Sequence, residues 1–573
     1  MAIAEVLKTD PEKWLVERGI PYLPEVVTGY GNDGPMDETT IIALSALMTN
    51  VGRPVYAFTD SMPQEASVAA LARYSRSPRP LRTLLAREFW GPGGLDLEKA
   101  RGLAGKVVME YGDDSVKQLG VARVACEMVS QLAVKEVEDG RIGGWLEKSS
   151  RYVNLGVPVN DRFLYLRPGE LRNLGLLRQR YQAVMDEAFD LYNESAEAMR
   201  GYLVEKFPKG EGVDEKAYRA SIRAKAFDIV RVFLPMATLT NVGMVLSAQA
   251  VENMLNKMQV SPLEESRVLA GEIREEVSKV MPSLVSDEAS DRYGQAARNY
   301  LTQSAARTRE VADRFLARLP KGETEVGGQR VELVERDPDA LKKVVAAILF
   351  KQSGANLAEV RELADSLSEV EMRELVGAYL MGRSDRRHKP GRAFEKAIYG
   401  FQITAKVAEW RDLQRQRMMT QERQLITMDN GFFVPPEFEQ VKVEDTRLAD
   451  LYRMHMGERK ELFDEVRDQA SPEVAQYVAG FGNFMKWQIT ANLRQLYHMI
   501  PLRAGAAGHP DYRRIAREMF YQMAEVDPIL ALPMERFIDF SDEPRLERLA
   551  QLAKVKAKLD RLGVIGGDTF SDE

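Results

Sequence analysis

Five side chains that can bind anions or nucleotide bases fall within one short stretch of this sequence. Residues 141 to 152 read Arg-Ile-Gly-Gly-Trp-Leu-Glu-Lys-Ser-Ser-Arg-Tyr. Within them Glu147, Ser149 and Arg151 alternate, so an extended backbone would point all three to one side. Arg151 can grip a phosphate, Ser149 can donate or accept, and Glu147 can orient a base or another arginine. The pattern predicts an anion cradle, although such polar runs are also typical of solvated loops.

The composition excludes several classes of protein. With 573 residues, of which 45% are hydrophobic and 29% charged, the chain is too long for one ordinary domain. The net charge of -7 gives no basic surface for duplexes, so no nucleic acid partner is expected. The single cysteine, Cys126, cannot form an internal disulfide and reads as part of an apolar helix face. Without a signal peptide or an apolar run of membrane-spanning length, we expect a cytoplasmic protein with no membrane partner.

Other common chemistries find little support in the motifs. The four histidines, at positions 388, 455, 498 and 509, are not closely paired, and with one cysteine they argue against a structural zinc site. The sequence contains no G-x-x-x-x-G-K-[ST], no G-x-G-x-x-G after a strand and no G-x-S-x-G. We therefore expect no metal ligands.

Helical periodicity dominates the elements that must position the polar stretch. Expected helices span residues 37–49, 64–74, 97–110, 115–138, 170–206, 215–233, 264–280 and 340–351. Expected strands span residues 54–59 and 162–167, and a further strand begins at Arg330. Asp37 can cap the first helix, with Thr40 three residues later. The pattern predicts a helix-rich α+β protein.

The order of strand, acidic turn and helix occurs twice. An offset of 276 sets Val331 against Val55 and also sets Arg417 against Arg141. One register that survives over this span indicates a tandem duplication. Further along, Arg494 matches Gln249 at a smaller offset of 245, so the first half is longer downstream.

The duplication divides the chain into five expected parts. They are an N-terminal extension (1–51), a first domain (52–320), a linker (321–328), a second domain (329–535) and a C-terminal tail (536–573). The linker is expected where glycines and polar residues interrupt the helical pattern.

Aligned in this way, each half resembles a subunit of the flavin-dependent thymidylate synthases. That family carries the motif R-H-R-x-x-S-x-N-E-x-S-x-R-Y. The first half keeps the arginine at the third position and the end of the motif, as Arg141, Glu147, Ser149, Arg151 and Tyr152. The second half keeps Arg415 and Arg417, has Gln416 for the histidine and Thr420 for the first serine, and then departs, with Arg423 at the glutamate position.

Two later family motifs divide between the halves in the same manner. The R-x-x-L-P motif is complete in the first half, from Arg231 to Pro235, whereas the second half has Gln476 in place of the arginine. The N-x-R-x3-[HN]-x4-R motif is complete in the second half, as Asn492, Arg494, His498 and Arg503, whereas the first half lacks both arginines. Pro501 is expected to kink or end the helix that carries this motif.

This complementary retention fits the assembly of the resembled family. Its subunits form tetramers, and each site combines residues of different subunits. A fused pair can therefore lose one set of groups from each half and still complete half of the sites. The resemblance implies a homodimer of this chain acting as a pseudo-tetramer.

The resemblance also implies an activity: methylation of dUMP to dTMP with methylenetetrahydrofolate, FAD and NADPH, the reduced flavin delivering hydride to the uracil ring. Expected substrate-binding residues are Glu147, Ser149, Arg151, Arg231 and Arg503, of which Arg503 is also the expected catalytic residue. Expected flavin-binding residues are Arg415, Arg417, Thr420, Asn492, Arg494 and His498. Two alternatives remain open at this point: an inert nucleotide- or flavin-binding paralogue, and a flavoenzyme acting on a related pyrimidine nucleotide.

Overall fold

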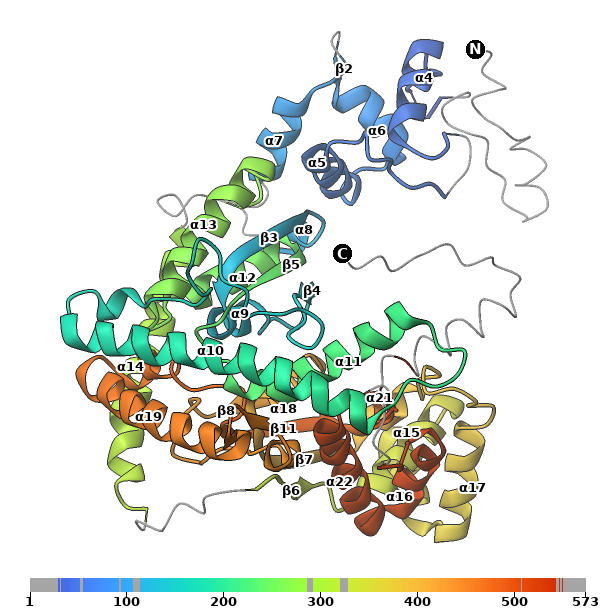
Figure 1. Cartoon of the computed structure of the whole chain (residues 1–573). Helices are drawn as coiled ribbons and strands as arrows, with labels where there is room; N and C mark the ends of the chain where they lie inside the picture. Colours follow the sequence, from blue (N-terminus) through green and yellow to red (C-terminus); the bar gives the residue numbers. More distant parts are fainter. Residues whose placement is uncertain are drawn as a thin grey trace. The chain divides into compact units, whose positions relative to one another are not determined.

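The computed structural model describes residues 29–542 except 31, 52–54, 92–93, 107–113, 286–291, 320–327 and 507, together with Leu546 and Leu549. The chain divides into two compact units, and neither is a continuous half of the sequence (Figure 1). Unit 1 contains the residues up to Cys126, residues 142–146 and residues 242–319. Unit 2 contains residues 127–141, 147–241 and those from 320 onward. The expected linker lies almost entirely outside the described residues, as do most of the N-terminal extension and the C-terminal tail.

Unit 1 is mainly helical. Its helices are α4 (Glu38–Leu47), α5 (Gln64–Tyr74), α6 (Leu81–Glu88), α7 (Leu97–Gly105), α8 (Asp114–Lys117), α12 (Ala248–Gln259), α13 (Glu264–Val280) and α14 (Arg292–Leu316), with a short hairpin of β1 (Trp90–Gly91) and β2 (Gly94–Leu95). Asp37 Oδ1 accepts from the Thr40 N–H at 2.9 Å, so the predicted cap is confirmed.

None of the described helices is long and apolar enough to cross a membrane.

The strand expected at residues 54–59 is wrong in its described part. Residues 55–59 contain only an isolated bridge between Phe58 and Met48. Their backbone groups bond back to the end of α4, where the Thr49 N–H donates to the Ala57 carbonyl at 2.9 Å. The segment therefore packs against its own helix and joins no sheet.

A helix was expected over residues 115–138, and the structure corrects it. Strand β3 (Val121–Ser130) occupies the middle, and only α9 (Gln131–Val137) follows as a helix. Cys126 thus lies buried on a strand, not on a helix face. The β-branched Val121, Val124 and Val129 favour the strand. β3 forms a three-stranded sheet in the order β3-β5-β4, with β5 (Leu239–Ser247) in the centre and β4 (Gly144–Glu147) at the end.

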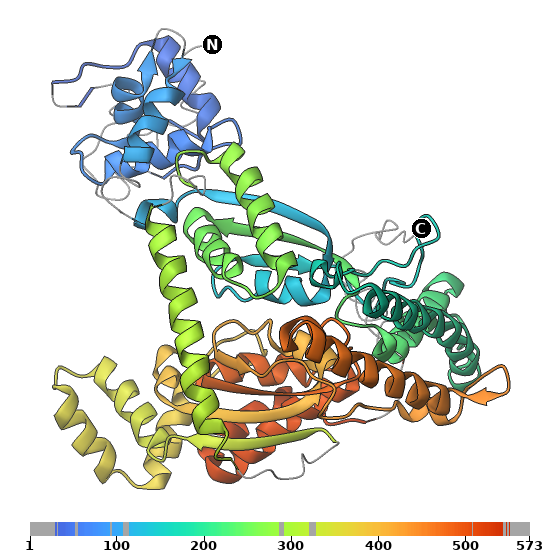
Figure 2. The ribbon, with the colours of Figure 1, turned by 90° about the vertical axis from the view of Figure 1, so that its left-hand side faces the viewer.

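Unit 2 is built on a four-stranded sheet in the order β6-β7-β11-β8 (Figure 2). Its strands are β6 (Arg330–Arg336), β7 (Ile398–Lys406), β8 (Thr420–Arg423) and β11 (Phe484–Asn492), all antiparallel to their neighbours. The helices around it include α15 (Ala340–Gln352), α16 (Leu357–Ser366), α17 (Glu369–Tyr379), α18 (Val407–Leu413), α21 (Leu493–Arg503) and α22 (Pro510–Val526). The alternation of buried and exposed residues along β11 shows that one face of this sheet belongs to the core.

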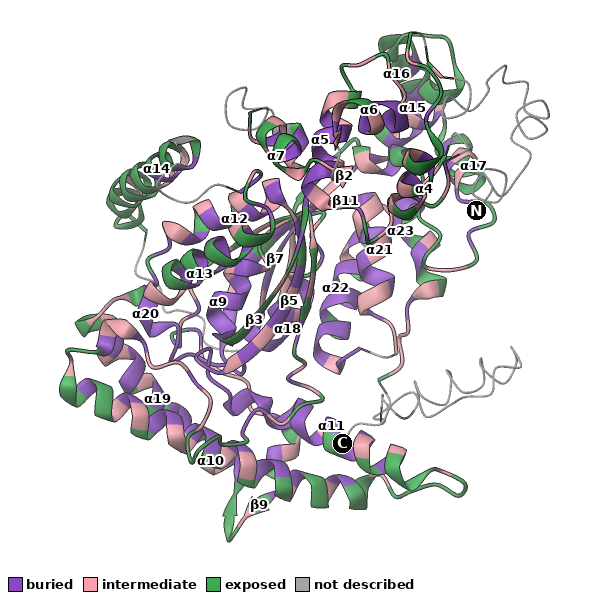
Figure 3. Cartoon of the chain, turned by 90° about the horizontal axis from the view of Figure 1, so that it is seen from above, coloured by how far each residue is buried: buried purple, intermediate pink, exposed green. Residues whose placement is uncertain are grey.

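Two long helices of unit 2 pack against each other, α10 (Gly175–Lys206) and α19 (Leu448–Gln469). In Figure 3 each has a buried and an exposed side. Arg180 bonds Glu461 and Glu465 across the pair. The helices α11 (Glu215–Val230) and η3 (Arg231–Phe233) follow α10 and agree with the expected helix. The strand expected at 162–167 does not form; Tyr165 makes only a bridge to Thr238.

The two sheets share one sequence of elements. The order β3-α9-β4-β5-α12, here called the first set, recurs as β7-α18-β8-β11-α21, the second set. The ends of β3 and β7 are related by the offset of 276, and the starts of β5 and β11 by the offset of 245. Both sheets also place the last strand between the other two. These offsets are those of the sequence register, and the extra residues of the first half fall between β4 and β5.

Within unit 2, the segment after Arg231 pairs with its counterpart after Gln476. The Met236 N–H donates to the Ala479 carbonyl at 2.7 Å, and the Phe481 N–H donates to the Leu234 carbonyl at 3.0 Å. The matching bridge joins Pro235 to Gly480 in antiparallel orientation. The two complementary segments therefore meet by backbone hydrogen bonds around a local two-fold axis.

A buried arginine holds this crossing together. Arg459 Nη1 donates to the Phe233 carbonyl at 2.8 Å, and Nη2 donates to the Val478 carbonyl at 2.6 Å. Burial lowers the pKa of Arg459 to about 10, so the guanidinium stays charged at neutral pH. A Cβ at Gly480 would lie 2.6 Å from Arg459 Nη2 and 2.8 Å from the Leu234 carbonyl oxygen, so only glycine fits there.

Pro501 is expected to kink or end helix α21, and the structure shows that the helix does not end there. It continues to Arg503 with Pro501 inside its last turn. Proline deprives the Tyr497 carbonyl, four residues earlier, of its intrahelical donor. Arg383 Nη2 donates to that carbonyl at 3.4 Å, which supplies a replacement. Arg503 is therefore the last residue of a continuous helix.

We predict that Arg459→Met lowers the free energy of unfolding by about 2–4 kcal/mol, because it leaves two buried carbonyl groups without this donor. Urea unfolding followed by circular dichroism measures the loss. The control is Arg453→Met on the same helix, whose half-exposed side chain pairs with Glu439 and Asp450. Its cost should stay below about 1 kcal/mol. Equal losses in both variants would show that Arg459 is not the clamp of the crossing.

Candidate functional site

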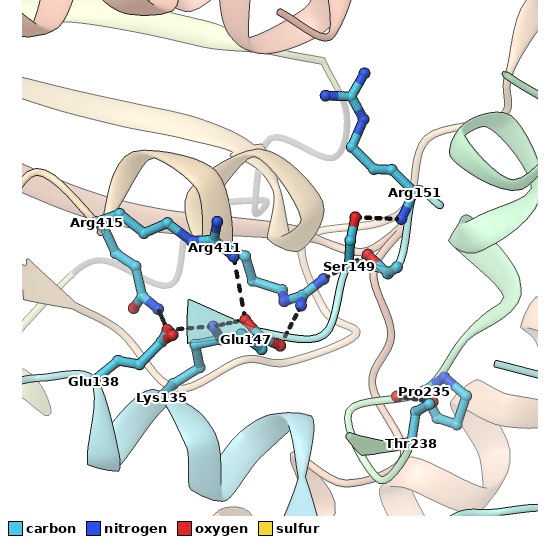
Figure 4. A network of polar contacts seen from close by, with 11 residues as sticks. Lys135, Glu138, Glu147, Ser149, Arg151, Pro235, Thr238, Arg411 and Arg415 are labelled. Atoms are coloured by element: carbon cyan, nitrogen blue, oxygen red, sulfur yellow. Dashed lines mark hydrogen bonds and ion pairs between the residues drawn. The ribbon is translucent and has the colours of Figure 1, made fainter. Parts of the chain in front are cut away.

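The carboxylate of Glu147 lies at the centre of a buried ionic network in unit 2 (Figure 4). Glu147 Oε2 lies 2.9 Å from Lys135 Nζ and 3.3 Å from Arg415 Nη2, and Oε1 lies 2.7 Å from Arg411 Nη2. Burial alone would raise the pKa of Glu147, but the charges of Arg411 and Lys135 outweigh it and hold the pKa far below its usual range. Its acceptor oxygens are thus engaged by cations from both sets of elements.

The backbone after Glu147 differs from the extended run expected for Glu147, Ser149 and Arg151. Strand β4 ends at Glu147, and residues 150–152 form a turn. Within it Ser149 Oγ accepts from the Arg151 N–H at 3.3 Å. Figure 4 shows the Arg151 side chain pointing away from Glu147. The expected alternation is wrong because a side-chain hydrogen bond favours the turn over continued strand.

Arg151 and Arg231 share one buried carboxylate, Asp228 on α11. Arg151 Nη2 lies 3.0 Å from Asp228 Oδ2, and Arg231 Nη2 lies 3.3 Å from Asp228 Oδ1. Burial alone would raise the pKa of Asp228, but Arg151, His509 and Arg231 outweigh it and lower the pKa. Asp228 therefore holds both guanidiniums in fixed positions.

Arg503 reaches this cluster from the second set of elements. Its guanidinium lies 5.5 Å from the centre of the Tyr512 ring. The pKa of Asp412 on α18 shows that these arginines come close to one carboxylate. Burial alone would raise this pKa, but the charges of Arg231, Arg503, Arg415 and Arg151 lower it. Three arginines expected to bind substrate thus act on one carboxylate within unit 2.

Each of the three guanidiniums retains a buried donor atom without a hydrogen-bond partner among the described residues; for Arg231 this atom is Nη2, which makes only its ion pair with Asp228. Among the described residues, the Nε atoms of Arg151 and Arg503 are buried and have no hydrogen-bond partner. A buried donor without a partner costs free energy. An acceptor oxygen within hydrogen-bond distance of each Nε atom would remove that cost.

A further buried chain of charged groups extends from Asp228. His509 Nε2 lies 3.6 Å from Asp228, and His509 Nδ1 lies 3.7 Å from Asp511. Burial lowers the pKa of His509 to about 3, so the imidazole is neutral at pH 7. Lys406 Nζ bonds both Asp511 and Glu409, and burial raises the pKa of Glu409 to about 7. Glu409, His509 and Asp511 bring ligand atoms within 4.8 Å of one another, and the Lys406 ammonium already pairs with both carboxylates there.

The residues expected to hold a flavin occupy varied environments. Arg415 and Thr420 are exposed, and Thr420 Oγ1 accepts from Arg141 Nη2 at 3.2 Å. Arg417 is half-buried. His498 is half-buried too, and burial together with the charges of neighbouring basic groups lowers its pKa.

Two further residues of that set have structural bonds in the second set of elements. Asn492 caps α21 by accepting from the Gln495 N–H at 2.9 Å. Arg494 donates through Nε to the Pro390 carbonyl at 2.8 Å and through Nη1 to Glu395 at 3.2 Å. Both side chains thereby fix the start of the helix that ends at Arg503.

The sequence motifs did not include the acidic and basic residues that form ion pairs with the expected site residues. Asp228 precedes Arg231 by three residues, and this spacing places two side chains on one face of a helix. The spacing could therefore have identified Asp228 as a partner of Arg231. The duplication register sets Arg411 against Lys135, so it could have linked these two cations. Nothing local in the sequence connects Arg411 with Glu147, or Arg231 with Asp412.

We predict that Glu147→Gln lowers the free energy of unfolding by about 3–5 kcal/mol near pH 7, because three cations lose their buried counter-charge. The pKa of Glu147 is depressed in the folded state, so the wild-type advantage is complete above the unfolded-state pKa of about 4.3 and shrinks as the pH falls below it. Urea unfolding at about pH 8, about pH 6 and about pH 3.5 measures the difference.

The matched control is Glu197→Gln, whose exposed carboxylate pairs only with Arg200 on the same helix among the described residues. It should change the free energy of unfolding by less than about 1 kcal/mol at every pH. A Glu147→Gln deficit that stays constant down to about pH 3.5 would contradict a depressed pKa.

Comparison with known proteins shows the family to which this chain belongs. The model of the thymidylate synthase complementing protein family matches the chain in two segments, residues 58–283 and 332–529. A solved structure of a UMP/dUMP methylase from Streptomyces cacaoi is similar over 37% of this chain and 97% of its own, with 21% identity and a TM-score of 0.29.

Curated relatives match nearly the whole chain. A UPF0159 protein of Chlamydia muridarum is 34% identical over 90% of this chain and 97% of its own length. A UPF0159 protein of Thermoplasma acidophilum is 28% identical over 85% of this chain and 98% of its own length. With the family model matched over most of its residues, the chain belongs to the thymidylate synthase complementing protein family.

Proposed function

We propose that this protein is a flavin-dependent thymidylate synthase that methylates dUMP to dTMP with methylenetetrahydrofolate, using FAD reduced by NADPH. The site combines Glu147, Ser149, Arg151 and Arg231 of the first half with Arg503 of the second. Family membership supports the reaction class, and the convergence of these arginines in unit 2 supports the site.

The observation that carries the proposal is the pair of unused guanidinium donors on Arg151 and Arg503. Arginine binds phosphate through two parallel hydrogen bonds and remains charged when buried. Arg231 adds a third positive charge fixed by Asp228. A nucleotide 5′-phosphate supplies the acceptor oxygens that this cluster lacks.

The roles of Glu147 and Ser149 follow from their contacts. Glu147 acts on the substrate through Arg411 and Arg415, because its own oxygens are bonded to them. Ser149 is half-buried and uses its oxygen as an acceptor, so its hydroxyl proton is available to a uracil carbonyl. Arg503, the proposed catalytic residue, stabilises negative charge that develops on the pyrimidine.

The residues of the second half fit a phosphate-bearing cofactor such as FAD. Arg415, Arg417, Thr420 and His498 offer donors at exposed or half-buried positions, whereas Asn492 and Arg494 shape the helix that borders them. When bound and reduced by NADPH, the flavin would supply to the uracil ring the hydride that is needed to turn the transferred carbon into a methyl group. The chain itself contributes binding, orientation and a fixed positive field.

We also propose that the protein is a cytoplasmic homodimer. A chain that carries two related halves retains the complementary motifs for one complete set of substrate arginines. Two chains would then provide two such sets in an assembly that resembles the family tetramer.

We predict that Arg503→Ala and Arg151→Ala each weaken dUMP binding about 100-fold or more, because each removes a charged donor from one phosphate cluster. Isothermal titration calorimetry with dUMP measures the loss, and circular dichroism checks the fold. Arg373→Ala, which removes an exposed arginine paired with Glu369, is the control and should bind like wild type. Unchanged dUMP affinity in both site variants would overturn the composite site.

We predict that the purified protein binds FAD, and that adding dUMP shifts the visible flavin band, because both ligands share one site. Arg415→Ala should weaken FAD binding about tenfold. Absorption and fluorescence titrations measure both effects. Flavin binding without turnover of dUMP would favour an enzyme for a related pyrimidine nucleotide, and no binding of either ligand would favour an inert paralogue.

A further inference from the structure

Strand β3 leaves one of its edges open. It is the end strand of the order β3-β5-β4, so among the described residues only β5 pairs with it. Its counterpart in the duplication register, β7, lies between β6 and β11. The first sheet therefore lacks the strand that would correspond to β6.

The residues that correspond to β6 lie elsewhere in unit 1. The register sets Arg330–Arg336 against positions 54–60, and the described residues 55–59 bond to the end of α4. Their place beside β3 is thus not filled by any described segment of the chain. An open edge exposes unpaired N–H and C=O groups that can pair with another strand.

Side-chain hydrogen bonds cover the outer edge of β6 in the other sheet, whereas the outer edge of β3 lacks such a cover along most of its length. At β6, Gln522 Oε1 accepts from the Leu333 N–H at 2.6 Å and its Nε2 donates to the Val331 carbonyl at 2.8 Å. At β3, two backbone N–H groups meet side chains of this kind: Val121 donates to Gln64 Oε1 at 2.9 Å, and Met128 donates to Asn241 Oδ1 of β5 at 3.3 Å. Between 122 and 127, no described residue outside the sheet covers the backbone in this way.

The charges of the exposed side chains on β3 are complementary to those of a second, antiparallel copy of the same strand. Arg123, Ala125 and Glu127 lie on one face of β3 and are exposed. Within the described part of the chain, neither Arg123 nor Glu127 forms an ion pair. If two copies of β3 run antiparallel with Ala125 opposite Ala125, each Arg123 stands directly opposite Glu127 of the other copy. Cross-strand pairs of opposite charge stabilise such a ladder, whereas like charges oppose it.

We propose that β3 is an interface with a second copy of this chain, formed by antiparallel pairing of Arg123–Glu127 about a two-fold axis at Ala125. Two-fold symmetry requires residues equidistant from the axis to attract each other, which Arg123 and Glu127 do. Met128, with a φ of 55°, ends the regular strand geometry at one side of the pairing. The joined sheet has the order β4-β5-β3-β3-β5-β4. This interface does not depend on the proposed reaction.

Cysteine cross-linking tests the axis directly. In a Cys126→Ala background, Ala125→Cys should yield a covalent dimer under mild oxidation, because the two Cβ atoms lie about 4.5–5.5 Å apart in such a pair. Non-reducing gel electrophoresis measures the yield. Val245→Cys in the same background is the control, because Val245 is exposed on the central strand β5 and should give no covalent dimer.

Charge exchange tests the register. In the Ala125→Cys protein, Arg123→Glu or Glu127→Arg alone should lower the cross-link yield about tenfold, and the two together should restore it. Sedimentation equilibrium of the same charge variants without the cysteine provides a second readout, with weaker association of each single variant and recovery in the double variant. No covalent dimer from Ala125→Cys, or a yield and an association that ignore the charges, would overturn the proposal.

Discussion

The candidate site depends on the crossing between residues 231–237 and 476–481, where the two complementary halves bond backbone to backbone in unit 2. Arg231 stands at the start of one crossing segment, and its counterpart Gln476 stands at the start of the other. Arg459 bonds carbonyl groups of both segments at once, so neither can shift without breaking a charged hydrogen bond. This fixed register allows Arg503 of the second half to act in the same cluster as Arg151 and Arg231 of the first.

The two halves differ in charge at positions that the sequence register pairs. Glu147 corresponds to Arg423 at the offset of 276, and Arg231 corresponds to Gln476 at the offset of 245. Arg423 Nη1 contacts Gln476 Oε1 at 3.5 Å, so the two replaced positions of the second half meet each other. One half thus retains a carboxylate ringed by cations, whereas the other has an arginine beside an amide. This asymmetry supports the proposal of one functional site per chain.

Buried charge is the common theme of the site. Glu147, Asp228 and Asp412 each stay ionised because guanidiniums surround them, and the same carboxylates hold those guanidiniums in place. Removing one member leaves its partners buried and unpaired, which costs more than the pair contributes. Such a network fixes positions in advance of ligand binding, so little ordering remains to be done when an anion enters.

The sequence by itself determined the helix-rich α+β class, the long helices around residues 175–206 and 264–280 and the repeated register, because periodicity and spacing are local properties. Local patterns failed over 115–138, where burial against neighbouring strands turned an apparent helix into β3, and at Pro501, where Arg383 replaced a lost hydrogen bond. The motifs named Arg151, Arg231 and Arg503 but could not show that they converge. Only the tertiary structure decided that, because Asp228, Asp412 and Arg459 act on groups far away in the sequence.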